Sequence, residues 1–204
     1  MLKLSDVLEA LIGQKIPQAS MVISEAVIDS RQAIPAALFV ALRGERVDGH
    51  DYIADAFQRG ASLALVDRDP GPDFRVLDLT GAGEISLPQL PFCLKVADSL
   101  AALQTIAKYW RAKFPVKVIG ITGSVGKSST KEVVAELLSM RYRTLKNLGN
   151  LNNEIGLPLT LLRLSAGYQR AVLEMGFYVP GEIAFLCELA KPSIGVVTNI
   201  GTVH

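Results

Sequence analysis

From residue 116 onward the chain alternates strand-like segments with amphipathic segments of helical period, and this order constrains the fold more than any other feature. Predicted strands cover residues 116–121, 142–146, 170–176 and 193–200, and predicted helices cover residues 128–140, 155–164 and 181–190. Nearly apolar strands that alternate with helices are typical of a parallel sheet covered on both faces. Ligands of such sheets collect at the carboxyl ends of the strands, so we expect a site at that edge.

The preceding part of the chain mixes the same two kinds of segment. Periodicity and turn residues predict helices at residues 4–12, 51–60 and 98–114, and strands at 21–28, 37–42, 62–67 and 92–96. We place a domain boundary between residues 95 and 96. The sequence therefore predicts an α/β protein in which a small mixed N-terminal domain, residues 1–95, precedes a mostly parallel-sheet central domain, residues 96–204.

Composition excludes some classes of partner. The 21 basic and 20 acidic residues give a formal charge of +1, which provides no bulk field to hold nucleic acid or an anionic membrane. No apolar run approaches the roughly 18 residues of a membrane span. Cys93 and Cys187 lie far apart without metal-ligand spacing, so we expect reduced thiols and a cytoplasmic protein.

The segment GITGSVGKSST, residues 120–130, lies between a predicted strand and a predicted helix. A phosphate site needs backbone N–H groups around one dense anion, in a tight turn without an obstructing Cβ, and Gly123 and Gly126 meet that need. Lys127 can reach the β and γ phosphates, and the Ser128 hydroxyl can bind Mg²⁺. The usual pattern is incomplete, since Ile121 stands where it has glycine. The context nevertheless predicts a site for a nucleoside triphosphate with Mg²⁺.

Apolar periodicity also predicts which face of the following helix is buried. Toward the sheet we expect Val133, Val134, Leu137 and Leu138. Toward solvent we expect Lys131, Glu132 and Glu136.

Other polar residues near predicted strand ends each allow two interpretations. Glu174 can hold Mg²⁺ or serve only as a helix cap or surface charge, and His204 can join that site or be inert. The asparagines of residues 147–153 can contact a ligand or only form turns. Arg31, in Asp29-Ser30-Arg31, can grip a phosphate or remain a surface residue, and we expect His50 to lie in a solvated loop.

Taken together, these blocks resemble the Mur ligase family of peptidoglycan synthesis, and within it the MurF type. The matching blocks are DSR, ALFVALRGERVDGHDY, ITGSVGKSSTKE, GNLNNEIGLPLTLLRL, LEMG with GEI, and TNIGTVH, in order across nearly the whole chain. The resemblance implies a cytoplasmic, ATP-dependent enzyme of cell-wall biogenesis. It would join D-alanyl-D-alanine to UDP-N-acetylmuramoyl-tripeptide through an acyl phosphate, with Mg²⁺.

The resemblance also implies roles for particular residues. It gives catalytic roles to Lys127, Glu174 and His204, and metal binding to Ser128, Glu174 and His204. The nucleotide would contact Gly123, Ser124, Val125, Gly126, Lys127, Ser128, Ser129 and Asn150. The UDP part of the substrate would contact Ser30 and Arg31, with His50 beside it.

The chain departs from the family pattern in three places. Val125 stands where many members have asparagine, Ser128 and Ser129 stand where they have threonine, and residues 177–180, FYVP, replace commoner small and polar residues. Family members also continue well past residue 204, so we expect an inactive fragment of a ligase. The alternatives are a MurE-type ligase that adds the third amino acid, a P-loop kinase or NTPase, and a binding module for UDP-sugar peptides.

Overall fold

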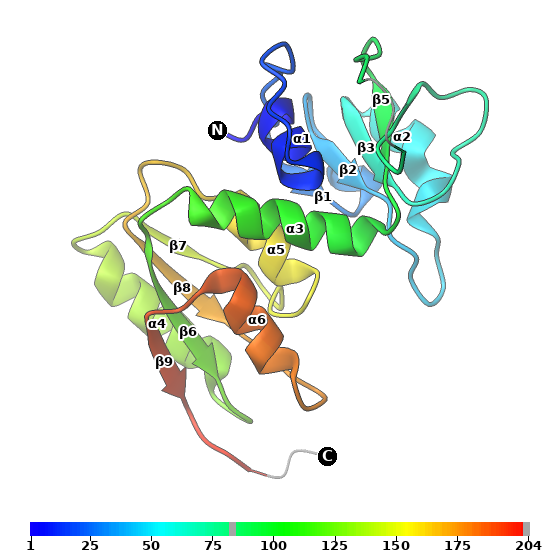
Figure 1. Ribbon diagram of the computed structural model, residues 1–204. Helices are drawn as coiled ribbons and strands as arrows, with labels where there is room; N and C mark the ends of the chain where they lie inside the picture. The colour runs from blue at the N-terminus through cyan, green and yellow to red at the C-terminus, as the bar shows by residue number, and fades with distance from the viewer. Residues whose placement is uncertain (82–84, 202–204) are drawn as a thin grey trace. The chain divides into compact units, whose positions relative to one another are not determined.

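The computed structural model describes residues 1–81 and 85–201 and divides into two compact units, Met1–Ile106 and Ala107–His204. Each unit is built on one parallel sheet (Figure 1). The prediction of an α/β protein with a mixed N-terminal part and a parallel-sheet central part is confirmed, and the sheet of the first unit is parallel as well. The division falls inside helix α3, Ser99–Ala112, so the boundary at residues 95 and 96 stays a prediction.

The first unit contains a five-stranded sheet of order β1-β2-β3-β5-β4 in which every pair is parallel. Its strands are β1 Ala26–Val27, β2 Leu38–Val40, β3 Leu63–Val66, β4 Val76–Asp78 and β5 Phe92–Lys95. Its helical segments are α1 Leu4–Ile12, η1 Ser30–Gln32, η2 Gly49–Tyr52 and α2 Ile53–Gln58. The strands β2 and β3 are buried throughout, as expected for the interior of a parallel sheet.

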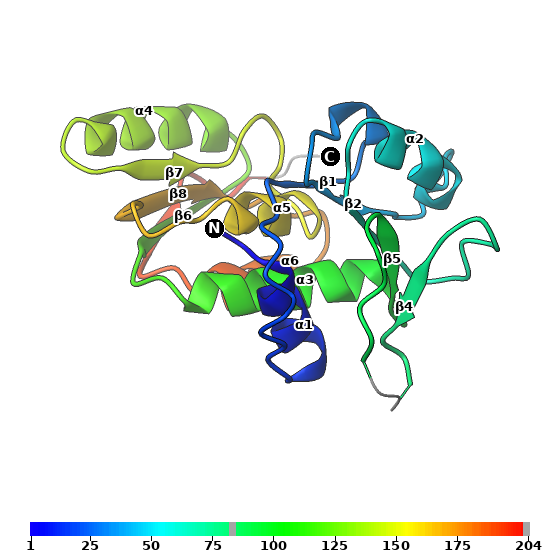
Figure 2. The ribbon, with the colours of Figure 1, turned by 90° about the horizontal axis from the view of Figure 1, so that it is seen from above.

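The second unit contains a four-stranded parallel sheet of order β7-β8-β6-β9. Its strands are β6 Lys117–Thr122, β7 Thr144–Lys146, β8 Arg170–Glu174 and β9 Ile194–Val197, and its helices are α4 Lys127–Ser139, α5 Gly156–Leu162 and α6 Glu182–Ala190. Helices α4 and α6 lie on opposite faces of this sheet (Figure 2). The predicted order of strands and helices after residue 116 is confirmed.

Helix α3 carries residues of both units. It begins where the Asp98 carboxylate accepts a hydrogen bond from the Ala101 N–H at 2.8 Å, which satisfies an otherwise unpaired donor of the first turn. Toward its other end, Trp110 donates from Nε1 to the Leu164 carbonyl at 3.0 Å, and Arg111 donates from Nε to the Ala190 carbonyl at 2.9 Å. These buried bonds anchor the end of α3 in the second unit.

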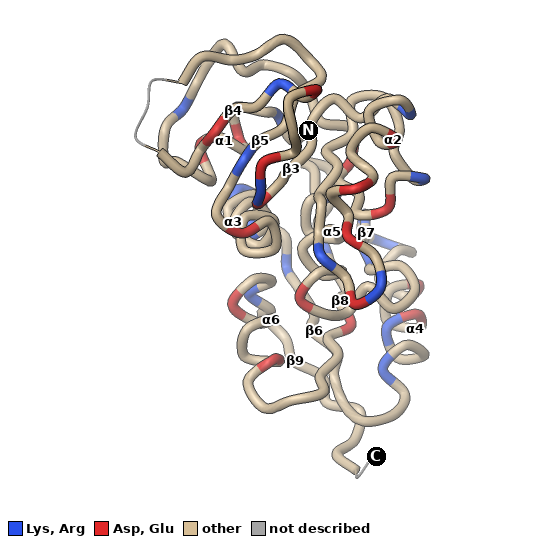
Figure 3. Tube along the Cα trace, turned by 90° about the vertical axis from the view of Figure 1, so that its right-hand side faces the viewer, with Lys and Arg blue, Asp and Glu red and all other residues tan. Residues whose placement is uncertain are grey.

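Acidic and basic residues are interspersed along both units (Figure 3). Among the described residues, no helix is both long and apolar enough to cross a membrane.

Candidate functional site

The glycine-rich segment forms a tight turn between β6 and α4. Gly123 has a φ of +134° and Gly126 a φ of +88°, both in the region that side chains rarely adopt. A Cβ on Gly123 would lie 2.2 Å from Thr198 Oγ1, so a side chain there would collide. The two glycines predicted to shape the turn therefore do so by conformation and by close approach.

Hydrogen bonds within the second unit hold this turn. Lys127 Nζ donates to the Gly123 carbonyl at 2.7 Å and to the Ser124 carbonyl at 3.3 Å, so its ammonium lies over the turn. The N–H of Ser124 donates to the Asn199 carbonyl at 3.1 Å, and that of Val125 donates to Asn199 Oδ1 at 2.9 Å. The N–H groups of the first turn of α4 point out of the helix, and such groups bind anions.

Glu174 ends β8 beside this turn, because β8 pairs with β6 in parallel and Ile121 lies opposite Glu174. Its side chain is 3% exposed. Oε2 accepts a hydrogen bond from Ser128 Oγ at 2.8 Å, and Oε1 accepts one from Asn152 Nδ2 at 2.8 Å. The parallel register thus brings together the two predicted metal-binding residues Ser128 and Glu174.

Lys131 is a buried cation at the same place. Its side chain is 2% exposed, and Nζ lies 3.9 Å from Glu174 Oε2 and 3.2 Å from Glu132 Oε1. Nζ also donates to the Asn147 carbonyl at 3.1 Å. Lys131 therefore compensates the buried Glu174 carboxylate and ties it to the asparagine-rich segment.

The prediction that Lys131 faces solvent is wrong, and so is part of the predicted buried stripe of α4. Val133 is 59% exposed and Leu137 is 63% exposed, whereas Val134 and Leu138 do pack against the core of the second unit. Helix α4 turns Lys131 and Ala135 fully inward and Val134 and Leu138 partly inward, while Ser128 contacts Glu174 from an exposed position. Lys131 lies three residues after Ser128, and this spacing on one helix face was the available signal.

Two asparagines form the support of Glu174. Asn147 accepts a hydrogen bond from the Glu174 N–H at 2.9 Å and donates to the Glu174 carbonyl at 3.0 Å, so one amide pairs with both backbone groups. Asn152 reaches the carboxylate itself. Asn150, the predicted nucleotide contact, is exposed, and its backbone carbonyl accepts a hydrogen bond from the Asn152 backbone N–H at 2.8 Å. The sequence pattern indicates this asparagine cluster, but it does not indicate that Asn147 and Asn152 are the members that contact Glu174.

A cavity of about 680 Å³ lies beside the turn, within the second unit. Gly123, Ser124 and Lys127 line one part of it, and Asn152 and Asn153 line another. The remaining wall comes from the segment after β8 and from α6. The predicted phosphate-binding turn therefore opens onto a space of ligand size.

The site offers oxygen and amide groups rather than a dense metal cluster. Over residues 1–81 and 85–201 no group of three or more His, Cys, Asp or Glu side chains is positioned to bind a metal. The Ser128 hydroxyl and the Glu174 carboxylate are hard oxygen donors, which suit Mg²⁺, an ion that usually keeps several waters. His204, the third predicted metal ligand, lies outside the described residues.

In the first unit, Asp29-Ser30-Arg31 forms the start of η1 after β1. Arg31 is 79% exposed and pairs with Asp29 at 2.7 Å, and this hydrogen bond lowers the pKa of the Asp29 carboxyl. Ser30 is buried, and its hydrogen bond lowers the pKa of the Asp55 carboxyl. Of the two predicted substrate contacts, only Arg31 presents its side chain to solvent.

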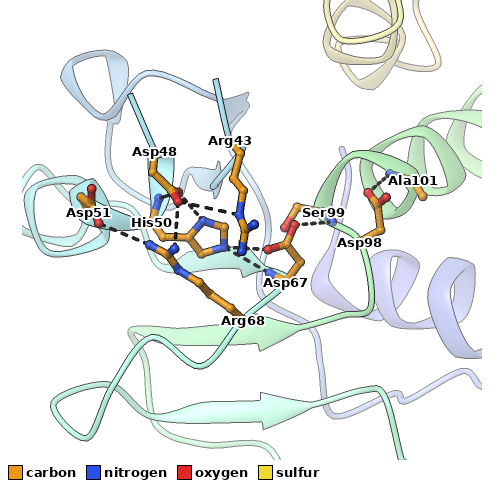
Figure 4. Close-up of polar contacts among 9 residues, drawn as sticks. All are labelled: Arg43, Asp48, His50, Asp51, Asp67, Arg68, Asp98, Ser99 and Ala101. Atoms are coloured by element: carbon orange, nitrogen blue, oxygen red, sulfur yellow. Dashed lines mark hydrogen bonds and ion pairs between the residues drawn. The ribbon is translucent and has the colours of Figure 1, made fainter. Parts of the chain in front are cut away.

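The prediction that His50 lies in a solvated loop is wrong, since its side chain is 2% exposed. Nδ1 lies 2.7 Å from Asp48 Oδ1, and Nε2 lies 3.2 Å from both the Asp67 N–H nitrogen and Asp67 Oδ1 (Figure 4). Arg68 closes the cluster by pairing with Asp48 at 2.9 Å. The turn of η2 and the end of β3 enclose the ring, a tertiary contact that the local polar sequence DGHD does not indicate.

Comparison with known proteins gives matches to both units. Residues 121–204 match the Mur ligase middle domain, and residues 22–82 match the domain described as Mur ligase family, catalytic domain. A UDP-N-acetylmuramoyl-tripeptide--D-alanyl-D-alanine ligase of Synechocystis is 43% identical over 176 residues. The match covers 86% of this chain but only 36% of that relative.

Solved structures of MurF proteins also resemble this chain. MurF from Acinetobacter baumannii superposes with a TM-score of 0.78 at 34% identity, over 99% of this chain and 41% of that one. MurF ligase from Thermotoga maritima, solved in complex with ADP, superposes with a TM-score of 0.70 at 34% identity, over 88% of this chain and 38% of that one. The chain thus spans well under half the length of each of these proteins.

Proposed function

Because this chain belongs to the Mur ligase family, we propose that the protein containing it is an ATP-dependent carboxylate–amine ligase of peptidoglycan precursor synthesis. We assign it the MurF reaction, which joins D-alanyl-D-alanine to UDP-N-acetylmuramoyl-tripeptide. The observation that carries this proposal is the contact of Ser128 with Glu174 at 2.8 Å beside a glycine-rich turn. The identity to relatives that bear this reaction in their name supports the choice of substrates.

The reaction proceeds in two balanced steps. The acceptor carboxylate attacks the γ-phosphorus of ATP, which gives an acyl phosphate and releases ADP. The amine of the dipeptide then attacks the acyl carbon, phosphate leaves, and the amine loses a proton. Such transfers depend on positioning and charge neutralisation rather than on a side-chain nucleophile.

The residues of the second unit divide these tasks. The N–H groups at the start of α4 and the ammonium of Lys127 bind the phosphate oxygens. To do so, the Lys127 ammonium exchanges its hydrogen bonds to the Gly123 and Ser124 carbonyls for bonds to phosphate. Ser128 and Glu174 are the residues that hold Mg²⁺, which neutralises phosphate charge when bound. Asn147, Asn152 and Lys131 keep the Glu174 carboxylate in place.

We assign the first unit to the UDP part of the acceptor, with the exposed Arg31 guanidinium as its phosphate contact. Ser30 and His50 are buried, so their contribution is to shape the loops that carry the contacts. We place the reaction in the cytoplasm, where the free thiols of Cys93 and Cys187 would stay reduced.

The test uses the full-length protein that carries this chain. With ATP, Mg²⁺, UDP-N-acetylmuramoyl-tripeptide and D-alanyl-D-alanine, we expect phosphate release and a product whose mass equals that of the joined substrates. Extension of the dipeptide precursor by a free diamino acid would instead indicate the MurE-type reaction. Absence of any ATP-dependent product would refute the ligase proposal.

Replacement of the loop lysine tests the phosphate assignment. Lys127→Ala removes a charged hydrogen-bond donor worth about 1.5–3 kcal/mol, so we expect ADP to bind roughly ten to a hundred times more weakly in calorimetry. Lys117→Ala, an exposed lysine at the other end of β6, is the matched control and should leave ADP affinity unchanged. Equal ADP affinity of Lys127→Ala and wild type would contradict the assignment.

A further inference from the structure

The formal charge of the whole chain, +1, hides an imbalance between its two units. Residues 1–106 contain 9 basic and 14 acidic residues, whereas residues 107–204 contain 12 basic and 6 acidic residues. Two halves of opposite charge cancel in the total and still present separate charged surfaces. The small net charge therefore does not exclude a local anion-binding surface on the second unit.

Half of the basic residues of the second unit lie at one edge of its sheet. Because β7, β8, β6 and β9 are parallel, the segments that lead into them share the edge opposite the glycine-rich turn (Figure 1). We call this the amino edge and define it as residues 114–117, 140–143, 163–170 and 191–193. It contains no acidic residue and six basic residues: Lys117, Arg141, Arg143, Arg163, Arg170 and Lys191.

Like charges are neighbours along the amino edge. Lys117 lies opposite Arg170 in the register of β6 and β8, and Arg170 also lies opposite Thr144, the residue after Arg143. Neighbouring strands are about 4.8 Å apart, so these cations repel one another. Folding stability therefore does not account for their grouping, which becomes electrostatically favourable when an anionic partner binds.

Two tyrosines hold arginines of the amino edge. The guanidinium carbon of Arg170 lies 3.9 Å from the ring centroid of Tyr142, and that of Arg143 lies 4.9 Å from the ring centroid of Tyr168. Such stacking uses the face of the guanidinium and leaves its N–H groups for an oxyanion. Among the described residues, neither guanidinium forms an ion pair, and their one hydrogen bond runs from Arg170 Nη1 to the Gln169 carbonyl at 2.8 Å. Most of their donors are therefore available to a partner.

The composition of the amino edge distinguishes between classes of anionic partner. A specific protein interface has an apolar core, but in these four segments, all of which the structure describes, Met140 is the only large hydrophobic residue that is exposed. A single-stranded nucleic acid stacks its bases on open aromatic rings, whereas Tyr142 and Tyr168 already stack against guanidinium groups. A membrane surface needs neither feature, because clustered cations attract anionic headgroups and tyrosine suits the headgroup level.

We propose that the amino edge is a docking surface for the anionic headgroups of a phospholipid membrane. Arg141, Arg143 and Arg170 donate to headgroup phosphates, and the exposed Met140 side chain enters the layer beside them. The glycine-rich turn follows the carboxyl end of β6, at the other edge of the same sheet, so docking does not cover the phosphate site. Membrane binding is therefore separable from the proposed reaction.

The experiment measures sedimentation of the full-length protein with vesicles. Vesicles of phosphatidylcholine and phosphatidylglycerol in equal amounts are compared with vesicles of phosphatidylcholine alone. Each cation near an anionic surface adds about fivefold in affinity, so we expect binding to the mixed vesicles to be at least about tenfold tighter. Raising the salt from about 0.1 M to about 1 M shortens the Debye length from about 10 Å to about 3 Å and should remove most of this difference. Equal binding to the two kinds of vesicle would overturn the proposal.

A pair of exposed arginines locates the effect. Arg141→Gln with Arg143→Gln removes two charges from the amino edge, and we expect the affinity for the mixed vesicles to fall about 25-fold. Lys15→Gln with Arg46→Gln removes two charges from exposed positions of the first unit and is the matched control, with an expected change below about twofold. A loss no larger in the arginine pair than in the control pair would overturn the proposal.

Other anions test the choice of partner. We expect polyuridylate and polyglutamate, at equal charge concentration, to bind more weakly than the mixed vesicles. Tighter binding of polyuridylate would indicate a nucleic acid partner, tighter binding of polyglutamate would indicate an acidic protein, and either result would overturn the proposal. Circular dichroism and ADP affinity should be unchanged in the arginine pair, because neither Arg141 nor Arg143 lines the cavity. Its loss of vesicle binding then reports on the amino edge rather than on misfolding.

Discussion

The charged clusters of the two units differ in what their members face. In the second unit, Glu174 and Lys131 are buried, and Glu174 contacts Asn152, which lines the cavity, and Ser128, which follows the glycine-rich turn. In the first unit, His50 is just as buried, but its two ring nitrogens face Asp48 and Asp67 of the same unit. Burial alone therefore does not distinguish a reactive site from a structural one. The cavity lined by Lys127 and by Asn152, which contacts Glu174, marks the difference between the two clusters.

The largest expected effect comes from removing the buried cation of the second unit. Lys131→Met keeps the volume but leaves the Glu174 carboxylate without its cation, so we expect a loss of about 3 kcal/mol in the free energy of unfolding. Urea unfolding is followed by circular dichroism, which reports on both units, and by fluorescence, which reports on the second unit because Trp110, the one tryptophan, packs against Phe114 and donates to Leu164.

The control for this variant is an exposed ion pair. Arg31→Ala breaks a pair whose arginine is 79% exposed, and we expect a change below about 1 kcal/mol. If Lys131→Met changed the free energy of unfolding as little as Arg31→Ala does, Lys131 would not compensate the charge of Glu174. The proposed difference between the two units would then be wrong.

An intermediate effect is expected at the buried ring of the first unit. His50→Phe keeps a ring and removes both nitrogens, so the Asp67 N–H loses its acceptor at a cost of about 1–3 kcal/mol. Hydrogen exchange measured by NMR should show faster exchange of the Asp67 amide. The Ala41 amide, which donates to the Leu65 carbonyl in the same sheet, serves as the internal reference. An unchanged exchange rate of the Asp67 amide would show that the His50 ring does not stabilise this part of the first unit.

The smallest effect concerns acid stability of the first unit. Hydrogen bonds from Thr80 and Lys95 lower the pKa of Asp78 from 3.8 to about 2. A lowered folded-state pKa stabilises the fold above the unfolded-state value, and this stabilisation is lost as pH falls through about 2. Asp78→Asn should therefore be less stable than wild type at pH 5, with the gap closing toward pH 2. A gap that is constant with pH would contradict the ionic origin of the effect.

Much of the fold could be read from local pattern. The strand-turn-helix order, the two glycines of the phosphate turn and the cap at Asp98 follow from residue type and spacing, because backbone freedom and capping act over a few positions. The same reasoning named Ser128 and Glu174, since carboxyl ends of parallel strands share one edge.

The rest depended on contacts between distant segments. Lys131 lies on the inner face of α4, where it meets the Glu174 carboxylate and the Asn147 carbonyl, which come from later segments of the chain. His50 is buried because the end of β3 covers it, and Asn147 and Asn152 hold Glu174 where Asn150 does not. Apolar periodicity carries no information on such polar contacts, so the rotation of α4 was predicted incorrectly in part.

The sequence by itself determined the α/β architecture, the glycine-rich turn and the position of Ser128 and Glu174 at the same sheet edge, since each arises from local conformational preference or from strand order. Only the tertiary structure decided which charges are compensated, which asparagines support the acid and which rings line the cavity. The physical reason is that charge and polar groups are stabilised by partners brought together from distant parts of the chain. The FYVP segment shows this best, because only the fold brings Phe177 and Tyr178 into the lining of the same cavity as the glycine-rich turn.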